Sequence, residues 1–334
     1  MKEIVIFGAG NYGRRALMTY LNEGEKIAFI VDNMSGKWGQ KILNIPIIGP
    51  AEFVSIKDKY RLVVAVNVNC QHEIERQLQK MGIDNYEIFN LKVQSEKERL
   101  ISYSDKKTLE DVLLYHVLKN EECIFYIDVG SNDPFEHSVT KLLYDMKNAN
   151  GINIEPQRGY YNLTQKERPR DINLCLGVGR QNGKMNLYFQ GGYSTVVQEN
   201  VIDENCEYQE IDVVTLKDIC DRYIKLEAVE DKCKREITFL KIDVEGAEYD
   251  VIVGADFEIY RPWIISVEST KPGTDIPNYD KWEAILLSNR YHFVMQIEEN
   301  RYYVANEKSE LDEKFCSISE LKKVYNIYYA ELLV

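Results

Sequence analysis

Short apolar runs that end at an acidic residue recur along this chain, and they restrict its fold more than any other feature. The clearest is residues 124–134, IFYIDVGSNDP, in which four apolar or aromatic residues lead to Asp128 and Gly130 ends the run. A short bounded run of this kind is typical of a strand buried on both faces of a parallel sheet. A helical pattern follows at residues 139–146. Strand, acidic residue, glycine turn and helix in succession predict an open α/β sheet that binds a ligand at the carboxyl ends of its strands.

Length and composition exclude several classes of protein. A chain of 334 residues is long enough for two domains, and its net charge of -13 argues against sequence-independent binding of nucleic acid. No apolar run approaches the roughly 20 residues of a membrane span, and the amino-terminal stretch does not resemble a signal peptide. The seven cysteines are scattered without a C-x-x-C, so we expect reduced, mostly buried thiols in a cytoplasmic protein. With four histidines, a histidine-rich metal site is not expected.

The first domain is expected at residues 1–91, where an apolar strand runs into a G-x-G-x-x-G turn and a second strand ends in an acid. The candidate nucleotide-binding residues are Gly8, Gly10, Asn11, Tyr12, Gly13 and Asp32. The glycines would let the backbone approach a pyrophosphate, and the carboxylate could hold a ribose diol. The domain resembles the small Rossmann-like domain of bacterial sugar acyltransferases, which implies a nucleotide or nucleotide-sugar ligand. The alternative is a glycine turn that serves only packing or dimerisation.

After a charged linker at residues 92–107, the second domain is expected at residues 108–334. Its second strand ends in Glu155 and Pro156, about 20 to 25 residues after the glycine turn, where Rossmann-type sheets place a carboxylate for a ribose diol. A turn at Gly177 and Val178 could let a flat base approach the backbone. The tyrosine-rich tail at residues 325–334 is expected to form a terminal helix or a dimer contact.

Two later strands also end in acids. Residues 237–248, ITFLKIDVEGAE, deliver Asp243 and Glu245, and the next strand delivers Glu268. We therefore expect Asp128, Glu155, Asp243 and Glu268 along one edge of a single sheet. Buried carboxylates are costly unless they have partners. Ligand hydroxyls, an amine, a cation, or a Lys/Arg network without a function could each supply them.

Several of these runs together resemble the FkbM family of S-adenosylmethionine-dependent methyltransferases, over roughly residues 121–306. They are DVGSN from Asp128, NIEP ending at Pro156, VTL ending at Leu216, and above all residues 240–248, LKIDVEGAE. The resemblance implies a seven-stranded class I methyltransferase sheet that ends in an antiparallel hairpin. It also implies methyl transfer to an oxygen, commonly a hydroxyl of a sugar or another natural product.

The resemblance also implies a cofactor site. Asp128, Gly130 and Ser131 would hold the methionine end of S-adenosylmethionine and Glu155 its ribose. The remaining expected cofactor residues are Asn132, Pro156, Gly177 and Val178. The family's glycine motif often has a third glycine where this chain has Pro134, so this turn must be made differently.

Transfer to a hydroxyl requires alignment of the acceptor oxygen with the methyl group, and a positioned base helps to remove the proton. His137 is one candidate base, and Asp243, Glu245 and Glu268 are the others. A divalent cation such as Mg²⁺, held by Asp243 and Glu268, could instead lower the pKa of the hydroxyl. Base catalysis ranks narrowly ahead of a metal.

The sequence therefore predicts a cytoplasmic two-domain α/β enzyme without a membrane span or a nucleic-acid partner. A nucleotide-sugar-binding module would be fused to an O-methyltransferase that acts on a sugar hydroxyl of a nucleotide sugar or glycan precursor, in polysaccharide biosynthesis. A homodimer stays open. One alternative is an NAD(P)-dependent oxidoreductase that uses the first domain. Another is a non-catalytic assembly subunit whose methyltransferase-like domain only binds ligands or partners.

Overall fold

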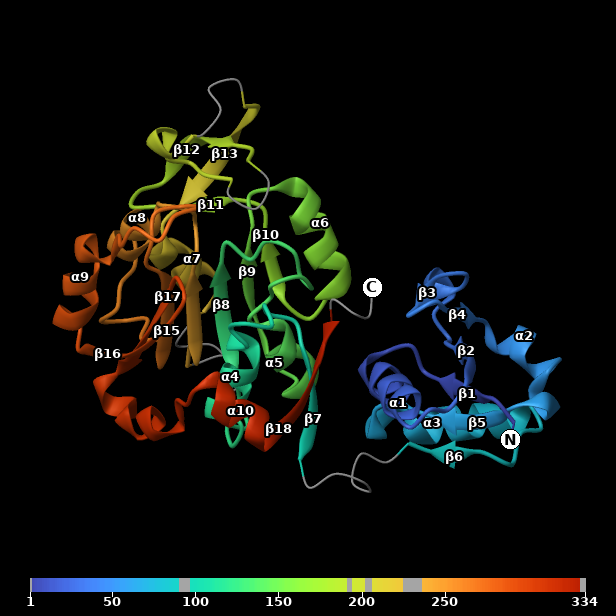
Figure 1. Cartoon of the computed structure of the whole chain (residues 1–334). Helices are drawn as coiled ribbons and strands as arrows, with labels where there is room; N and C mark the ends of the chain where they lie inside the picture. The colour runs from blue at the N-terminus through green and yellow to red at the C-terminus, as the bar shows by residue number, and fades with distance from the viewer. Residues whose placement is uncertain (1, 90–96, 191–193, 202–205, 225–235, 331–334) are drawn as a thin grey trace. The chain divides into compact units, whose positions relative to one another are not determined.

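The computed structural model describes residues 2–89, 97–190, 194–201, 206–224 and 236–330, and the chain divides into two compact units (Figure 1). The first unit comprises Met1–Ile101 and Val324–Val334, and the second comprises Ser102–Lys323. Across the described segments, no helix is long and apolar enough to cross a membrane. Each unit is described by itself below.

The first unit is built around a six-stranded sheet with the order β3-β4-β2-β1-β5-β6, in which only the β3–β4 pair is antiparallel. Ile4 and Ile6 of β1 belong to one hydrophobic cluster, and Val5 and Phe7 belong to another. Helix α1 covers the first of these faces, while α2 and α3 cover the second. The elements are β1 (Ile4–Phe7), α1 (Asn11–Asn22), β2 (Ile27–Val31), β3 (Lys41–Ile42), β4 (Ile45–Ile48), α2 (Pro50–Val54), β5 (Arg61–Val64), α3 (Val68–Lys80) and β6 (Glu87–Ile88).

A separate two-stranded sheet joins β7 (Glu98–Ser102) to β18 (Tyr325–Tyr329). The prediction of a linker without regular structure is therefore wrong at residues 98–102, and residues 92–96 lie outside the described part. The expected terminal helix is also wrong, because β18 is a strand. Aromatic and β-branched residues favour strands, but the partner of each strand lies more than two hundred positions away and no local pattern reveals it.

The second unit is built around a seven-stranded sheet with the order β10-β9-β8-β14-β15-β17-β16. Every pair is parallel except the two that involve β17, so the predicted sheet with its terminal antiparallel hairpin is confirmed. Every residue of β8, β14 and β15 is buried, as their largely apolar sequences predict, and this includes the charged residues Asp128, Lys241 and Glu268. Figure 1 shows a smaller sheet, β11-β13-β12, beyond the carboxyl ends of β8 and β9.

The elements of the second unit are α4 (Glu110–Val117), β8 (Phe125–Val129), α5 (Lys141–Met146), β9 (Asn150–Ile154), α6 (Arg158–Glu167), β10 (Ile172–Leu174), β11 (Gly177–Val178), β12 (Gly183–Tyr188), β13 (Tyr208–Val214), α7 (Leu216–Tyr223), β14 (Phe239–Ile242), α8 (Glu248–Val253), β15 (Ile264–Glu268), α9 (Glu283–Ser288), β16 (Tyr291–Ile297), β17 (Asn300–Ala305) and α10 (Ile318–Val324). Strands β9, β8, β14 and β15 are neighbours in the sheet and run parallel to one another. The carboxyl ends of β8, β9, β14 and β15 consequently lie along one edge, as the sequence predicts.

The cysteines correct one expectation. Cys123 is disulfide-bonded, so the expectation of reduced thiols is wrong for this residue. Among the free cysteines that the structure describes, only Cys220 is buried, so the expectation of mostly buried thiols is wrong as well. The other free cysteines are Cys70, Cys175, Cys206 and Cys316. Scattered positions in a sequence do not reveal which cysteines meet or which face the core.

The ends of β8 and β14 approach so closely that only glycine fits after β8. Gly130 has a φ of +77°, and a Cβ on it would lie 1.7 Å from the backbone oxygen of Asp243. Both the positive φ and the contact with backbone exclude a larger residue. The predicted glycine turn is thus a packing requirement of the sheet as well as a way to expose backbone to a ligand.

We expect Gly130→Ala to destabilise the second unit by at least about 2 kcal/mol, because strained φ angles and backbone overlap each cost energy. Gly159→Ala, in helix α6, is the matched control, since no surrounding atom lies within 4 Å of where its Cβ would be. That control should gain up to about 1 kcal/mol from helix propensity. Differential scanning calorimetry measures both changes, and equal melting temperatures in the two variants would contradict the packing argument.

Candidate active site

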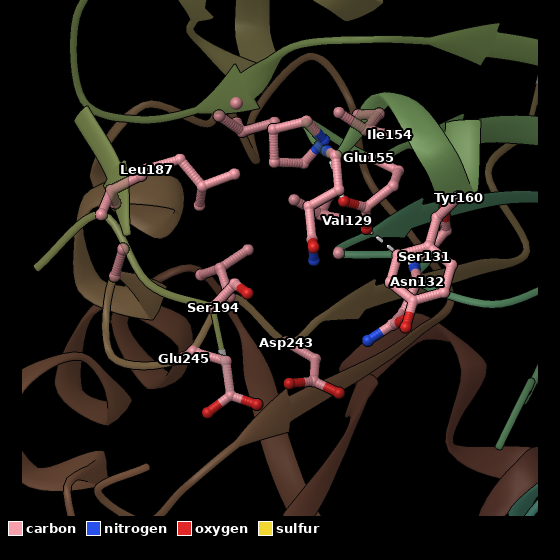
Figure 2. Close-up of a pocket in the computed structure, with 18 of the residues that line it drawn as sticks. Val129, Ser131, Asn132, Ile154, Glu155, Tyr160, Leu187, Ser194, Asp243 and Glu245 are labelled. Atoms are coloured by element: carbon pink, nitrogen blue, oxygen red, sulfur yellow. Dashed lines mark hydrogen bonds between the residues drawn. The ribbon is translucent and has the colours of Figure 1, made fainter. Parts of the chain in front are cut away.

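A cavity of about 310 Å³ opens at the carboxyl ends of β8, β9 and β14, against the smaller sheet. Figure 2 shows Glu155, Asn132 and Tyr160 on one side of it and the carboxylates of Asp243 and Glu245 on another. Most of the site residues predicted for the second unit line this cavity. They are Gly130, Ser131, Asn132, His137, Glu155, Pro156, Gly177, Val178, Asp243 and Glu245.

Two predicted residues, Asp128 and Glu268, do not belong to the lining. Asp128 is buried behind it, where its Oδ2 accepts a hydrogen bond of 2.8 Å from the Thr140 hydroxyl. Its Oδ1 lies 3.7 Å from the Lys241 ammonium. Asp128 therefore braces the strand ends from behind the cavity, and its Oδ1 has no hydrogen-bond partner among the described residues. A contact between Asp128 and the cofactor's methionine end stays a prediction.

The loop after β8 is held by Arg168, which sequence reasoning missed. The Arg168 side chain is buried, and its Nη1 donates to Thr140 Oγ1 at 2.6 Å and to Asn153 Oδ1 at 3.2 Å. Its Nη2 donates to the Pro134 carbonyl at 3.1 Å and to the Ser138 hydroxyl. These hydrogen bonds hold the loop at Pro134, the position where the family's motif often has a third glycine. No signal in the charged stretch around Arg168 distinguishes it from surface residues.

Glu155 links the glycine turn to the start of α6. Its two carboxylate oxygens accept hydrogen bonds from the backbone N–H of Asn132, at 2.9 Å, and of Gln157, at 2.7 Å. Burial raises the pKa of Glu155 to about 7, although these two hydrogen bonds favour its ionised form. Each oxygen keeps capacity for another donor, as a ribose diol would require.

Ser131 offers the cavity a free hydroxyl. The residue is 9% exposed, and its buried Oγ has no hydrogen-bond partner among the described residues. Buried polar atoms are normally paired, so an unpaired hydroxyl on a cavity wall indicates a ligand that supplies the partner. The opposite wall is apolar and comes from the smaller sheet, through Val178, Leu187, Ile211 and Val213.

Lys241 is the second residue that sequence reasoning missed. Its ammonium is buried, lies 2.9 Å from Asp243 Oδ2 and donates to the Gly130 carbonyl at 3.1 Å. Burial by itself would lower the pKa of Lys241, but Asp243 and Asp128 outweigh it and raise the pKa above its usual value. A lysine inside an otherwise apolar strand was the available signal, because such a charge needs a partner.

The carboxylates of Asp243, Glu245 and Glu268 form a cluster in which one oxygen from each residue lies within 4.8 Å of the others. Burial, together with the neighbouring carboxylates of Asp243 and Glu248, raises the pKa of Glu245 to about 8 and that of Glu268 to about 11. Glu248 is fully buried and accepts hydrogen bonds from the backbone N–H of Val244 and Gly246, so it holds the turn that carries Glu245. His137 lines the cavity from the loop after β8 and is exposed.

The first unit brings its predicted residues together in a different way. Asp32 Oδ2 accepts from the backbone N–H of Ala9 at 2.7 Å, and its Oδ1 accepts from Met34 at 2.8 Å. A Cβ on Gly13 would lie 1.6 Å from the Gly8 carbonyl oxygen, so these glycines are needed for packing. Tyr12 packs against the core, while Gly10 faces open space and Asn11 begins α1. Nucleotide binding by this turn stays a prediction.

Comparison with known protein families identifies the second unit as a methyltransferase domain, in agreement with its strand order. Residues 128–293 match the family model of the methyltransferase FkbM domain. The second unit is an FkbM-family methyltransferase domain. Residues 1–89 match the model of the C2185-like N-terminal family. No curated protein matches the chain.

One solved structure that resembles the chain is the methyltransferase FkbM from Methylobacillus flagellatus KT. It is 16% identical, and the match covers 91% of this chain and 90% of that one with a TM-score of 0.35. The assignment of the FkbM domain therefore rests on the family model and on the strand order. Both agree with the resemblance seen in residues 240–248.

Glu155 should give the stability of the FkbM domain a pH dependence that Glu155→Gln removes. Its pKa of about 7 in the folded protein exceeds its ordinary value of 4.5, so the folded state holds the proton more tightly than the unfolded state. The resulting stabilisation is complete below pH 4.5 and is lost as the pH rises through 7. Urea unfolding from pH 4.5 to 8 should show a smaller loss in Glu155→Gln than in the wild type.

Other buried acids, such as Glu110, titrate in the same range, so the quantity to compare is the difference between the two proteins at each pH. A difference that does not change with pH would contradict the assignment of this proton to Glu155.

Proposed function

We propose that the FkbM domain uses S-adenosylmethionine to methylate a hydroxyl oxygen, and that the acceptor is a sugar hydroxyl of a nucleotide sugar or glycan precursor. The observation that carries this proposal is that the cavity has two chemically different sides. Its cofactor side combines the glycine turn, the Ser131 hydroxyl, Glu155 and an apolar wall. Its acceptor side combines Asp243 and Glu245.

The residues of the cofactor side fit this cofactor. Glu155 can accept hydrogen bonds from a ribose diol, and the unpaired Ser131 hydroxyl can bond to the methionine end. The apolar residues of β11, β12 and β13 can cover a flat base. When bound, S-adenosylmethionine supplies a methyl group on a sulfonium that is already a good leaving group. The domain must then mainly align the acceptor oxygen and exclude water.

The charge of the cavity supports a neutral, hydroxyl-rich acceptor. Acids that line it are Asp133, Glu136, Glu155, Asp243 and Glu245, and Lys241, the one lysine among the described lining residues, is already paired with Asp243. A phosphate or carboxylate at the acceptor side would meet mostly negative charge. A charged group such as a diphosphate is therefore disfavoured at the acceptor side. As a separate proposal, the glycine turn of the first unit binds a nucleotide.

The acceptor's proton must leave as its oxygen bonds to the methyl carbon. Asp243 and Glu245 on one side and His137 on another reach the cavity, and Glu268 lies beside Asp243. One oxygen of Asp243 is held by Lys241, which fixes the direction of the carboxylate and leaves the other oxygen available. A fixed carboxylate can orient the hydroxyl and hold the developing positive charge.

Isothermal titration with S-adenosylmethionine, NAD and a UDP-sugar distinguishes the proposal from its rivals. We expect S-adenosylmethionine to bind, and Glu155→Ala to weaken that binding about 10- to 100-fold, because hydrogen bonds to a charged group contribute about 1.5 to 3 kcal/mol. Binding of NAD alone would contradict the proposal in favour of an oxidoreductase. Binding of none of the three would favour a non-catalytic assembly subunit.

Asp243→Ala should abolish methyl transfer and leave the binding of S-adenosylmethionine largely intact, because Asp243 lies on the acceptor side of the cavity. Release of S-adenosylhomocysteine in the presence of candidate sugar acceptors measures the first effect, and calorimetric titration measures the second. Turnover retained in a folded Asp243→Ala protein would remove Asp243 from the mechanism.

A further inference from the structure

We propose that Asp243, Glu245 and Glu268 bind a divalent metal cation of the Mg²⁺ type at the acceptor side of the cavity. The role of this cation in methyl transfer rests on the proposed function, but its binding does not. The three ligands come from the end of β14, from the turn that follows it and from the end of β15. They belong to two neighbouring parallel strands, whose register is fixed by the sheet.

The spacing of the cluster fits a hard cation. One oxygen from each residue lies within 4.8 Å of the others. Opposite ligands lie about 4.2 Å apart around Mg²⁺ and about 4.6 to 5.2 Å apart around Ca²⁺, which is twice the usual metal–oxygen distance. Carboxylate oxygens are the ligands that these cations prefer. Adjacent ligands around Mg²⁺ lie closer, about 3 Å apart, so the three side chains would move inward to close around the cation.

Glu268 supplies a separate observation that points to a ligand. It is only 6% exposed, and its Oε2 is buried without a hydrogen-bond partner within the part of the chain that the structure describes. The Oε2 atoms of Glu245 and Glu248 are also buried without a hydrogen-bond partner among the described residues. Carboxylate oxygens withdrawn from water without a partner are costly, so native proteins provide a proton, a donor or a cation for them.

The nearby lysine does not balance this charge. Lys241 lies 2.9 Å from Asp243 and 3.7 Å from Asp128, so its one positive charge is shared between these two acids. This charge does not balance the carboxylates of Glu245, Glu248 and Glu268. A divalent cation offsets their negative charge without requiring protons.

The turn that carries Glu245 is held rigidly, as a metal ligand requires. Glu245 has a φ of +56°, a conformation that is uncommon outside glycine and that clusters at functional sites. Its carbonyl accepts hydrogen bonds from Thr195 Oγ1 at 2.7 Å and from Asn200 Nδ2 at 3.2 Å. Gly246 has a φ of +102°, and a Cβ on it would lie 2.1 Å from that same Asn200 nitrogen, so a larger residue there would strain the turn.

The geometry also indicates what the cation would do. Asp243 and Glu245 line the cavity and Glu268 lies behind them, so the positions of the cation not filled by protein face the cavity. Neighbouring hydroxyls of a sugar can occupy such positions, and coordination lowers the pKa of a hydroxyl. With the three carboxylates engaged, His137 is the remaining candidate base that lines the cavity.

Binding of Mn²⁺ to the full-length protein after removal of metals with a chelator tests the proposal. Electron paramagnetic resonance should count one bound Mn²⁺ per chain, and Mg²⁺ should displace it. Glu268→Gln and Glu245→Gln should each weaken Mn²⁺ binding at least 10-fold. Glu136→Gln is the matched control, because Glu136 lines the same cavity outside the cluster, and it should bind Mn²⁺ as the wild type does.

Thermal unfolding provides a second readout. Mn²⁺ should raise the melting temperature of the wild type and of Glu136→Gln, but not that of Glu268→Gln. Without metal, Glu268→Gln should be at least as stable as the wild type, because the substitution removes a buried carboxylate with an unpaired oxygen. Loss of Mn²⁺ binding then cannot be attributed to unfolding.

Failure of the wild type to bind Mn²⁺, or wild-type affinity in Glu268→Gln, would overturn the proposal. Titration of S-adenosylmethionine into the same samples separates this result from the proposed function. Cofactor binding without Mn²⁺ binding would reject the metal site and leave the methyltransferase proposal intact. Mn²⁺ binding without cofactor binding would support the metal site and reject the methyltransferase proposal.

Discussion

The buried ammonium of Lys241 is the interaction on which the site depends. It lies between Asp128 and Asp243 and donates to the carbonyl of Gly130, so one charge holds the ends of β8 and β14 together. Breaking a buried pair of this kind costs about 3 to 5 kcal/mol, because it leaves an uncompensated charge. The backbones of Gly130 and Asp243 lie so close at these strand ends that a Cβ on Gly130 would overlap the Asp243 carbonyl oxygen.

Two other interactions extend this support around the cavity. Arg168 ties the loop after β8 to Thr140, whose hydroxyl in turn bonds to Asp128. Glu155 joins the glycine turn to the start of α6 through two backbone N–H groups. The walls of the cavity are therefore positioned by hydrogen bonds from behind, and the surfaces that face it keep unused polar atoms. Such prior organisation lets a methyltransferase act mainly by alignment.

The sequence predicted the sheet and most of the cavity, because the signals for them are local. Apolar strands that end in an acid or a glycine turn identify the residues at the strand ends, and parallel strands bring those ends to one edge. Asp128 was placed on the cavity because a strand-end acid can either face a ligand or brace the sheet, and the sequence does not distinguish the two. Lys241 escaped notice because the residues on both sides of it are apolar, so the run was taken as an ordinary buried strand although one of its residues is charged.

Other features depend on residues distant in sequence. Arg168 gives no local sign that its guanidinium is buried, and the pairing of β7 with β18 joins opposite ends of the chain. The acidic cluster was partly foreseen, since Asp243 and Glu268 were expected together. The addition of Glu245 to them depends on a left-handed turn that only the structure shows.

A crystal structure with S-adenosylhomocysteine bound is the most direct test of the cofactor site. We expect the ribose hydroxyls to bond to Glu155, the homocysteine to lie along residues 130–132, and the sulfur to face Asp243. The base should lie against the apolar wall of the smaller sheet. A ligand bound elsewhere, or one whose ribose does not contact Glu155, would contradict the assignment of this cavity to the cofactor.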